Sequence, residues 1–456
     1  MTPFAKGFFA LVITGVILAH SSPRVCSEEM EHPHPLKPLQ PPSQIESPSS
    51  EQTLSLENLQ QMALENNPTL VQAATDIRAA EGRRIQAGLY PNPIIGYEGE
   101  EISVDEPSER GVHSLVIEQR IVTAGKLRYA RDVFAQEQSQ AEIEQAAQKA
   151  RVLNDVRITY YQALGAQRAL ELRTELARVA REAVDISEQL YNVGQADRPD
   201  VLTAEVEAEK ADLELENAKN EMEREWCLLA SVVGKPELER ARLEGELEAQ
   251  APELDRETMT KKLMSESPII KALHARSDRA AAALQLANAV RYSDVTLRAG
   301  YSYSQEPNES QVVLGISLPL PMFDRNQGNI ASASAELERS REEIRRAGLA
   351  LRAQLATAFA DYADAARAAE RYREAIVPNA QKAYDMYNEG FMQMTAAYPQ
   401  VLIAQRNLFQ AQVDYNQTLV DLWQSTARIE GMLLTGGLDA PESRAAGIRA
   451  SRDRAE

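Results

Sequence analysis

The chain has 456 residues, of which 26% are charged and only 5% aromatic, and its formal net charge at pH 7 is -19. This composition favours long, solvent-exposed helices over one compact, aromatic-rich core. The negative charge argues against nucleic acid as a partner, because phosphate groups would be repelled.

Residues 1–21 have the pattern of a secretory signal peptide. Lys6 supplies a positive charge, Phe8 to Ala19 form a short apolar run, and Ala19-His20-Ser21 fits a cleavage site with small residues. The apolar run is too short to cross a bilayer as a helix, so we predict that the mature protein is exported. Lipidation of Cys26 stays open, because Pro23-Arg24-Val25 lacks the small residue expected before such a cysteine.

Two further segments are predicted to lack a packed core. Residues 22–52 form a linker rich in Pro and Ser, and residues 436–456 form a polar tail that we expect to be disordered. The remaining cysteine, Cys227, is predicted to be a small buried hydrophobe and not half of a disulfide.

One short motif occurs twice, about two hundred residues apart. Leu190-Tyr191-Asn192-Val193-Gly194 leads into Asp200-Val201-Leu202, and Met386-Tyr387-Asn388-Glu389-Gly390 leads into Gln400-Val401-Leu402. Each copy ends one Ala- and Glu-rich stretch and begins another, which indicates a duplicated helix–turn–helix. The sequence therefore predicts two tandem repeats, at 53–240 and 241–435, with turns at about 190–202 and 386–402.

The segments around these turns have the patterns of long helices. Pro68 and Pro268 suit the first turn of a helix in each repeat. Long helices are predicted from Lys126 to about Asn192 and from Gly328 to about Asn388. After each turn, apolar residues recur every seven positions, which predicts coiled-coil packing. The two series of positions are Val201, Ala208, Leu215, Met222 and Leu229, and Val401, Leu408, Tyr415, Leu422 and Ile429.

Each repeat also has two short segments in which apolar and polar residues alternate, at about 93–121 and 294–319. This pattern is typical of β-hairpins. One interpretation is a small soluble sheet beside a helical bundle. The other is a sheet that meets lipid, in which case four strands per chain cannot close a barrel and the protein must oligomerise. Dimers and trimers both satisfy that requirement.

The sequence resembles the TolC family of outer-membrane efflux proteins over about residues 53–435. The motif Pro399-Gln400-Val401-Leu402-Ile403-Ala404-Gln405-Arg406-Asn407-Leu408 is most similar to the cobalt–zinc–cadmium branch of that family. Other similar segments occur in the same order as in the family: Asn67-Pro68, Ala87-Gly88-Leu89-Tyr90-Pro91-Asn92-Pro93, Ile117-Glu118-Gln119-Arg120-Ile121, Gly125-Lys126, Leu318-Pro319-Leu320-Pro321 and the two Tyr-Asn-x-Gly turns.

This resemblance implies a mainly α fold with a small β part, assembled as a homotrimer. Twelve strands would form a barrel in outer-membrane lipid, and long helical hairpins would form a tunnel in the periplasm. The tunnel would dock onto a periplasmic adaptor protein and an inner-membrane efflux pump. The two turns would be its adaptor-contacting tip, with Gly194 and Gly390 as left-handed helix ends. The residues expected there are Asn192, Val193, Gly194, Asn388, Glu389 and Gly390.

The gate is where the sequence departs from the family. Well-known members carry two aspartates after the second turn, whereas the matching positions here are Gln400 and Ile403. Asp200, after the first turn, is the nearest remaining acid, so the gate candidates are Asp200, Gln400 and Ile403. Asp197, Arg198 and Asp200 form either an ionic latch or a solvated helix start.

The predicted function is therefore a passive exit duct that carries metal ions or small toxic compounds from the periplasm to the exterior. The chain has no recognisable catalytic set, metal site or nucleotide loop, so we expect neither an enzyme nor a cofactor. Two alternatives stay open, a duct for peptide or protein secretion and an exported coiled-coil scaffold without a pore. The sequence does not identify the substrate, the pump or the adaptor.

Overall fold

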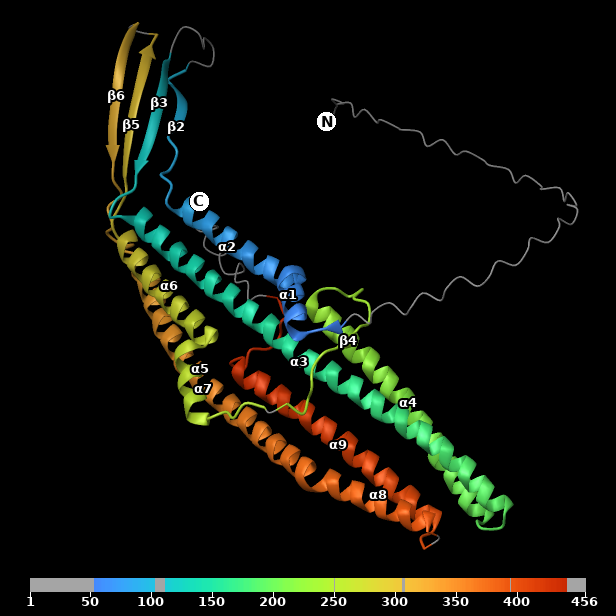
Figure 1. The fold of residues 1–456 in the computed structure, drawn as a ribbon. Helices are drawn as coiled ribbons and strands as arrows, with labels where there is room; N and C mark the ends of the chain where they lie inside the picture. The colour runs from blue at the N-terminus through green and yellow to red at the C-terminus, as the bar shows by residue number, and fades with distance from the viewer. Residues whose placement is uncertain (1–52, 103–110, 250, 306–307, 394, 441–456) are drawn as a thin grey trace, which may run out of the picture. The chain divides into compact units, whose positions relative to one another are not determined.

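The computed structural model describes residues 53–102, 111–249, 251–305, 308–393 and 395–440 (Figure 1). Its elements fall into two successive sets that follow the same order. The first set is β1 (Thr53–Leu54), α1 (Leu56–Asn66), α2 (Pro68–Ala87), β2 (Ile94–Glu100), β3 (Val112–Ile121), α3 (Lys126–Asn192) and α4 (Arg198–Val233). The second is β4 (Arg242–Leu243), α5 (Arg256–Glu266), α6 (Pro268–Val290), β5 (Val295–Ser304), β6 (Glu309–Ser317), α7 (Gln327–Arg371), a π-helical turn (Tyr372–Ile376), α8 (Val377–Met392) and α9 (Tyr398–Glu430).

Equivalent signals start the short helices of both sets. Pro68 and Pro268 each lie in the first turn of a helix, as predicted. The side chain of Asn67 accepts a hydrogen bond from the Thr69 amide at 3.0 Å and caps α2. Its Nδ2 also donates to the Val232 carbonyl at 2.9 Å, so the start of α2 is tied to the end of α4.

The long helices agree with the predicted heptad series. Every member of both series is buried except Tyr415, which is partly buried. The predicted helix from Gly328 to Asn388 forms as one helical run from Gln327 to Met392, within which a π-helical turn separates α7 from α8. Pro378 lies in the first turn of α8. A proline inside an α-helix removes a hydrogen bond and clashes with the preceding turn, and the wider π turn accommodates it.

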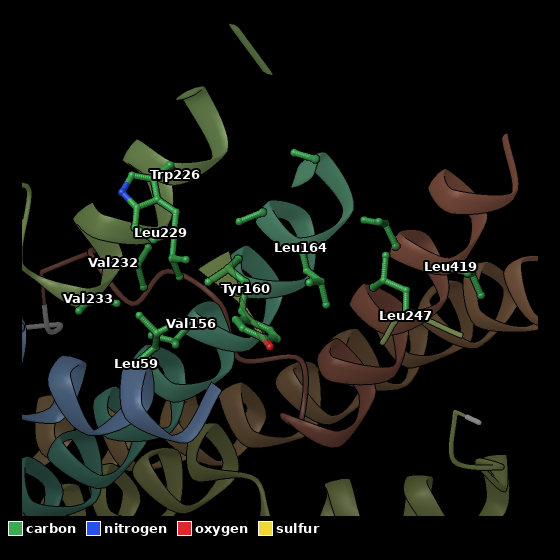
Figure 2. Close-up of a cluster of buried hydrophobic side chains, with 14 of the residues drawn as sticks. Leu59, Val156, Tyr160, Leu164, Trp226, Leu229, Val232, Val233, Leu247 and Leu419 are labelled. Atoms are coloured by element: carbon green, nitrogen blue, oxygen red, sulfur yellow. The ribbon is translucent and has the colours of Figure 1, made fainter. Parts of the chain in front are cut away.

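The main hydrophobic core joins the two repeats (Figure 2). Leu59, Val156 and Leu229 are fully buried in it, and Leu419 of α9 packs against the same cluster. The short strands β1 and β4 pair in parallel beside it and so connect the beginnings of the repeats.

Cys227 is exposed and free, so its predicted burial is wrong. It lies five residues after Met222 of the buried series, which rotates it toward the solvent face of α4.

The remaining four strands form one antiparallel sheet in the order β2-β3-β5-β6. One face of this sheet is apolar and exposed, since the paired positions Tyr97, Leu115, Tyr301 and Val312 all lie on it. Within the described residues, no buried hydrophobic cluster includes a member of this face. The finding argues against a soluble sheet packed on a helical bundle, because such a sheet would bury its apolar face.

An ion network fixes the point where the sheet joins the helices. Asp294, which directly precedes β5, accepts from Lys126 Nζ at 2.6 Å and from the Thr123 amide at 3.0 Å, and pairs with Arg120 at 2.7 Å. Burial would raise the pKa of Asp294, but the hydrogen bonds from Lys126, Thr123 and Arg120 outweigh it and hold that pKa below its ordinary value. The junctions of the two repeats are therefore held together.

Both ends of the chain extend outside the described residues. The predicted signal peptide, the linker and Cys26 lie there, as do residues 441–456. The start of the predicted tail is packed, because the amides of Gly436 and Gly437 both donate to Asp155 Oδ2 at 3.0 and 2.6 Å. Among the described helices, none is long and apolar enough to cross a membrane.

Candidate functional site at the paired turns

The first turn, residues 193–197, ends α3 with a left-handed glycine. The Gln195 amide donates to the Leu190 carbonyl at 2.8 Å, and the Gly194 amide donates to the Tyr191 carbonyl at 3.0 Å. These two bonds form a Schellman motif, which places Gly194 at φ +74°. A Cβ at Gly194 would meet no atom within 4 Å, so the requirement for glycine is conformational. The prediction of a left-handed end at Gly194 is confirmed.

Charged residues close the same turn on the side of α4. Asp197 and Asp200 form a capping box, in which the Asp200 carboxylate accepts from the Asp197 amide at 3.3 Å. Pro199 follows in the first helical turn, and an acid at this end of a helix is favoured by the helix dipole. Between the two interpretations of these acids, the geometry favours the helix start. Arg198 instead reaches Glu205 on its own helix, at 3.8 Å.

The second turn, of which residues 393 and 395–397 are described, is built differently. Gly390 lies inside α8, which continues to Met392, so the predicted left-handed helix end at Gly390 is wrong. The Gly390 carbonyl accepts three donors, namely the Thr395 amide, the Ala396 amide and Thr395 Oγ1, at 2.8, 3.1 and 3.0 Å. A Cβ at Gly390 would lie 3.1 Å from the Ala396 Cβ. Here glycine is needed because the chain folds back closely against it.

An aromatic pair replaces the capping box in the second turn. The rings of Phe391 and Tyr398 lie 5.0 Å apart, one at each side of the turn. Burial, with smaller contributions from Tyr384 and Glu182, raises the pKa of Tyr398 to about 12. No side chain caps the start of α9, whose N-cap is Ala397. The second turn therefore combines its hydrogen bonds with aromatic packing, whereas the first combines its hydrogen bonds with a capping box.

The predicted contact residues lie on these turns with different exposure. Asn192, Val193, Gly194 and Glu389 are exposed, whereas Asn388 and Gly390 are half-buried. Val193 is the most prominent apolar group of the first turn, with 69% of its surface exposed. The two turns thus present a mixed apolar and polar surface at the ends of their hairpins.

Two of the three gate candidates line one groove next to the turns. Asp200 and Ile403 both line a groove of about 390 Å³ formed by α3, α4 and α9, together with Pro399 and Leu402. Gln400 is exposed, and its amide donates to Ala397 in the first turn of α9. The structure therefore brings Asp200 and Ile403 to one groove, while Gln400 is not among its lining residues.

Sequence reasoning missed the ion pair that connects the two hairpins at this groove. Arg406 of α9 lies 3.7 Å from Glu207 of α4. The sequence does contain a signal for this pair. Arg406 lies five residues after Val401, and Glu207 lies six residues after the equivalent Val201, so opposite charges occur at nearly equivalent places in the two helices. The role of Tyr398 was also missed, because its ring contacts Phe391 only once the turn has folded.

Comparison with known proteins identifies the family to which this architecture belongs. The model of the outer membrane efflux protein family matches residues 59–235 and again residues 260–433. The chain belongs to this family. The two matches fall on the two successive sets of elements, and together they cover most of the chain, so this outer-membrane efflux channel carries the family unit twice.

Individual relatives agree with this assignment. The cobalt-zinc-cadmium resistance protein CzcC of Cupriavidus metallidurans is 28% identical over 389 residues, which cover 83% of this chain and 90% of CzcC. The outer-membrane channel OprN matches with a TM-score of 0.71 at 18% identity, over 84% of this chain and 91% of OprN. The CmeC outer membrane channel of Campylobacter jejuni matches with a TM-score of 0.66 at 17% identity, over 85% of this chain and 87% of CmeC. These structures share the fold of this efflux channel.

Proposed function

We propose that the chain is the passive exit duct of a tripartite efflux system and works as a homotrimer. The observation that carries this proposal is the exposed apolar face of the sheet β2-β3-β5-β6, at the opposite end of α3 from the turns. The 67 residues of α3 span about 100 Å at 1.5 Å per residue. A lipid-facing sheet and a remote helical tip are the two ends that such a duct needs.

Closure of the sheet supports the trimer. The outer edges of β2 and β6 have no neighbouring strand within the described residues. Unpaired backbone groups in lipid cost several kcal/mol each, so these edges must pair with another chain. Three copies give twelve strands, enough for a barrel with an open lumen, whereas the eight strands of a dimer enclose a space filled by side chains.

The turns support a contact with a periplasmic adaptor protein. Asn192, Val193 and Gly194 on the first turn, with Asn388, Glu389 and Gly390 on the second, form the proposed contact surface. The adaptor would connect the duct to an energised inner-membrane pump. Asp200, Gln400 and Ile403 are the proposed gate, and the Arg406–Glu207 pair would restrain the hairpins that must separate for the gate to open.

The substrate proposed for this duct is a metal ion or another small toxic compound. The relative CzcC is named as a resistance protein for cobalt, zinc and cadmium, which favours metal export. The duct needs no metal-binding site of its own for this role, because a pump can supply the selectivity. A duct for peptide or protein secretion would use the same passive pore. The two functions differ in the substrate that the pump delivers.

The test compares the full chain with a version that lacks the predicted signal peptide. For the full chain we expect heat-modifiable trimers in the outer-membrane fraction and single channels in planar bilayers. Bulky or charged replacement of Gly194 or Gly390 should leave the trimers and the channels intact. Efflux in cells should be lost in the same variants. Free soluble material without conductance would contradict the pore and favour the coiled-coil scaffold. Normal efflux in the glycine variants would contradict the assignment of the two turns as the adaptor-contacting tip.

A further inference from the structure

The junction between sheet and helices exposes large apolar side chains that the proposed pore does not use. Phe323 has 90% of its surface exposed, and it follows Leu320 and Met322, which are also exposed. Tyr90 and Tyr292, which follow α2 and α6 at equivalent places in the two repeats, are also exposed. We call this set, Tyr90, Tyr292, Leu320, Met322 and Phe323, the junction belt.

The position of the junction belt fits one boundary of a lipid bilayer. The loop end of the same sheet has its own exposed tyrosines, Tyr97, Tyr301 and Tyr303. The strand from Val295 to Tyr303 covers about 26 Å, or about 20 Å along the membrane normal at the usual strand tilt of ~40°, and Tyr292 lies three residues before the start of that strand. That spacing is close to the ~25 Å apolar band of outer-membrane barrels, in which aromatic residues mark both boundaries.

The junction carries exposed arginines, one of them next to the exposed Asp324, whereas the loop end carries exposed acids. At the junction, Arg291 and Arg325 are exposed, and neither forms an ion pair with a carboxylate in the part of the chain that the structure describes. Arg291 instead lies over the ring of Tyr292, 5.3 Å from its centre. At the loop end, the described residues include the exposed acids Glu100 and Glu309. In a chain with a net charge of -19, exposed arginines without a carboxylate partner among the described residues are available to an anionic ligand.

A groove places Arg291 next to apolar surface. It has a volume of about 670 Å³ and is lined by Arg291 and Tyr292 from the end of α6, Thr123 and Ala124 from the start of α3, and Leu318, Pro319 and Pro321 after β6. Leu318 continues the exposed apolar face of β6, which includes Leu314 and Ile316. A molecule with an anionic head and an apolar tail matches both parts of this surface.

We propose that this junction groove binds the headgroup phosphate of an anionic phospholipid, with its acyl chains along β6 and Phe323 anchored at the boundary. The proposal rests on the proposed function, because it requires the sheet to lie in lipid. Arg291 supplies charge-assisted hydrogen bonds to the phosphate, and Arg325 adds to the positive field. The phospholipid would fix the depth of the duct and brace the network of Asp294, which lies next to the groove lining at Ser293.

The test measures lipid binding by the purified full chain in neutral detergent. Phosphatidylglycerol and phosphatidylcholine are titrated in mixed micelles, and bound lipid per chain is counted by mass spectrometry. We expect phosphatidylglycerol to bind more tightly, and the variant Arg291→Gln with Arg325→Gln to lose on the order of tenfold in that affinity. A control variant with Arg78→Gln and Arg341→Gln removes the same charge from exposed positions on α2 and α7 and should keep the preference.

Four outcomes would overturn the proposal, of which three concern the phospholipid itself. These three are equal binding of both lipids, an unchanged preference in the junction variant, and displacement of the lipid by millimolar inorganic phosphate, which would indicate a small-anion site. Preferential binding of lipopolysaccharide over phosphatidylglycerol would also count against it. Trimers and conductance are measured on the same samples, so a failure of the pore is recognised separately from a failure of lipid binding.

Discussion

The two turns occupy equivalent places in the repeats but are stabilised by different interactions. In the first turn, backbone hydrogen bonds around a left-handed Gly194 end α3, and a capping box of Asp197 and Asp200 starts α4. In the second, three donors converge on the carbonyl of Gly390, and the rings of Phe391 and Tyr398 pack across the turn. A shared Tyr-Asn-x-Gly motif therefore does not imply shared geometry.

This difference indicates which turn is the more easily rearranged. The first turn is closed by local backbone bonds and fixed charges, which hold as long as both helix ends are intact. The second has bonds to the Gly390 carbonyl and packing between two rings but no side-chain cap on α9, and α8 has no buried residue along its length. We expect the second turn to open at a lower free-energy cost, so that movement at the tip begins with α8 and α9.

The largest effect is expected for Tyr398→Ala. It removes the ring pair and its buried surface, which should destabilise the second turn by about 2 kcal/mol. Hydrogen exchange at neutral pH measures this locally, since peptides covering residues 384–404 should exchange faster while those covering 188–204 are unchanged. Equal acceleration in both turns would show that the turns are not independent.

The protonation of Tyr398 gives a second way to separate the turns. Because its pKa in the folded chain is raised to about 12, the neutral phenol stabilises the fold fully below its ordinary value near 10, and this stability is lost as pH rises from about 10 to 12. The melting temperature of Tyr398→Phe should therefore fall less over that window than that of the unmodified chain. Parallel decreases would contradict the burial of this hydroxyl.

Substitutions at the two glycines distinguish handedness from size. Gly194→Ala should cost about 1 kcal/mol because of its left-handed φ, whereas Gly194→Asn should cost less, since Asn tolerates that conformation. At Gly390 the order should be reversed, because Ala is smaller than Asn and the contact with Ala396 is close. Thermal denaturation of the four variants checks this, and the same order at both positions would refute the distinction.

The smallest effect on stability is expected at the ion pair between the hairpins. Arg406→Gln removes its contact with Glu207, which is partly exposed and so contributes less than about 1 kcal/mol. Conductance is the more sensitive measurement, since a looser groove should increase the open fraction of single channels. Arg345→Gln, which breaks an ion pair within α7, is the matched control and should leave conductance unchanged.

Much of the fold could be predicted because its signals are periodic and local. The heptad series predicted which face of α4 and α9 is buried, and the period-two alternation predicted β5 and β6. The sequence could not show that Gly390 is helical, because the contact with Ala396 arises only when the longer second turn folds back. The exposure of Cys227, by contrast, follows from its phase five residues after Met222, and residue type alone points to the wrong face.

At the candidate site, the sequence predicted where the turns lie but not how they are held. The aromatic pair joins Phe391 to Tyr398 across the turn, and the ion pair joins helices of different repeats. Both depend on how the hairpins pack, which a pattern along one chain does not report. The Asp197–Asp200 capping box is local, and its two acids were visible in the sequence.

The central claim is that the paired turns are the adaptor-facing end and the sheet is the lipid-facing end. Site-specific photo-cross-linking in cells that express the whole efflux system tests it most directly, with a photoreactive amino acid in place of Val193 in one strain and of Tyr97 in another. The account predicts a covalent product with a periplasmic adaptor protein from position 193 and none from position 97. An adaptor product from position 97, with none from position 193, would contradict it.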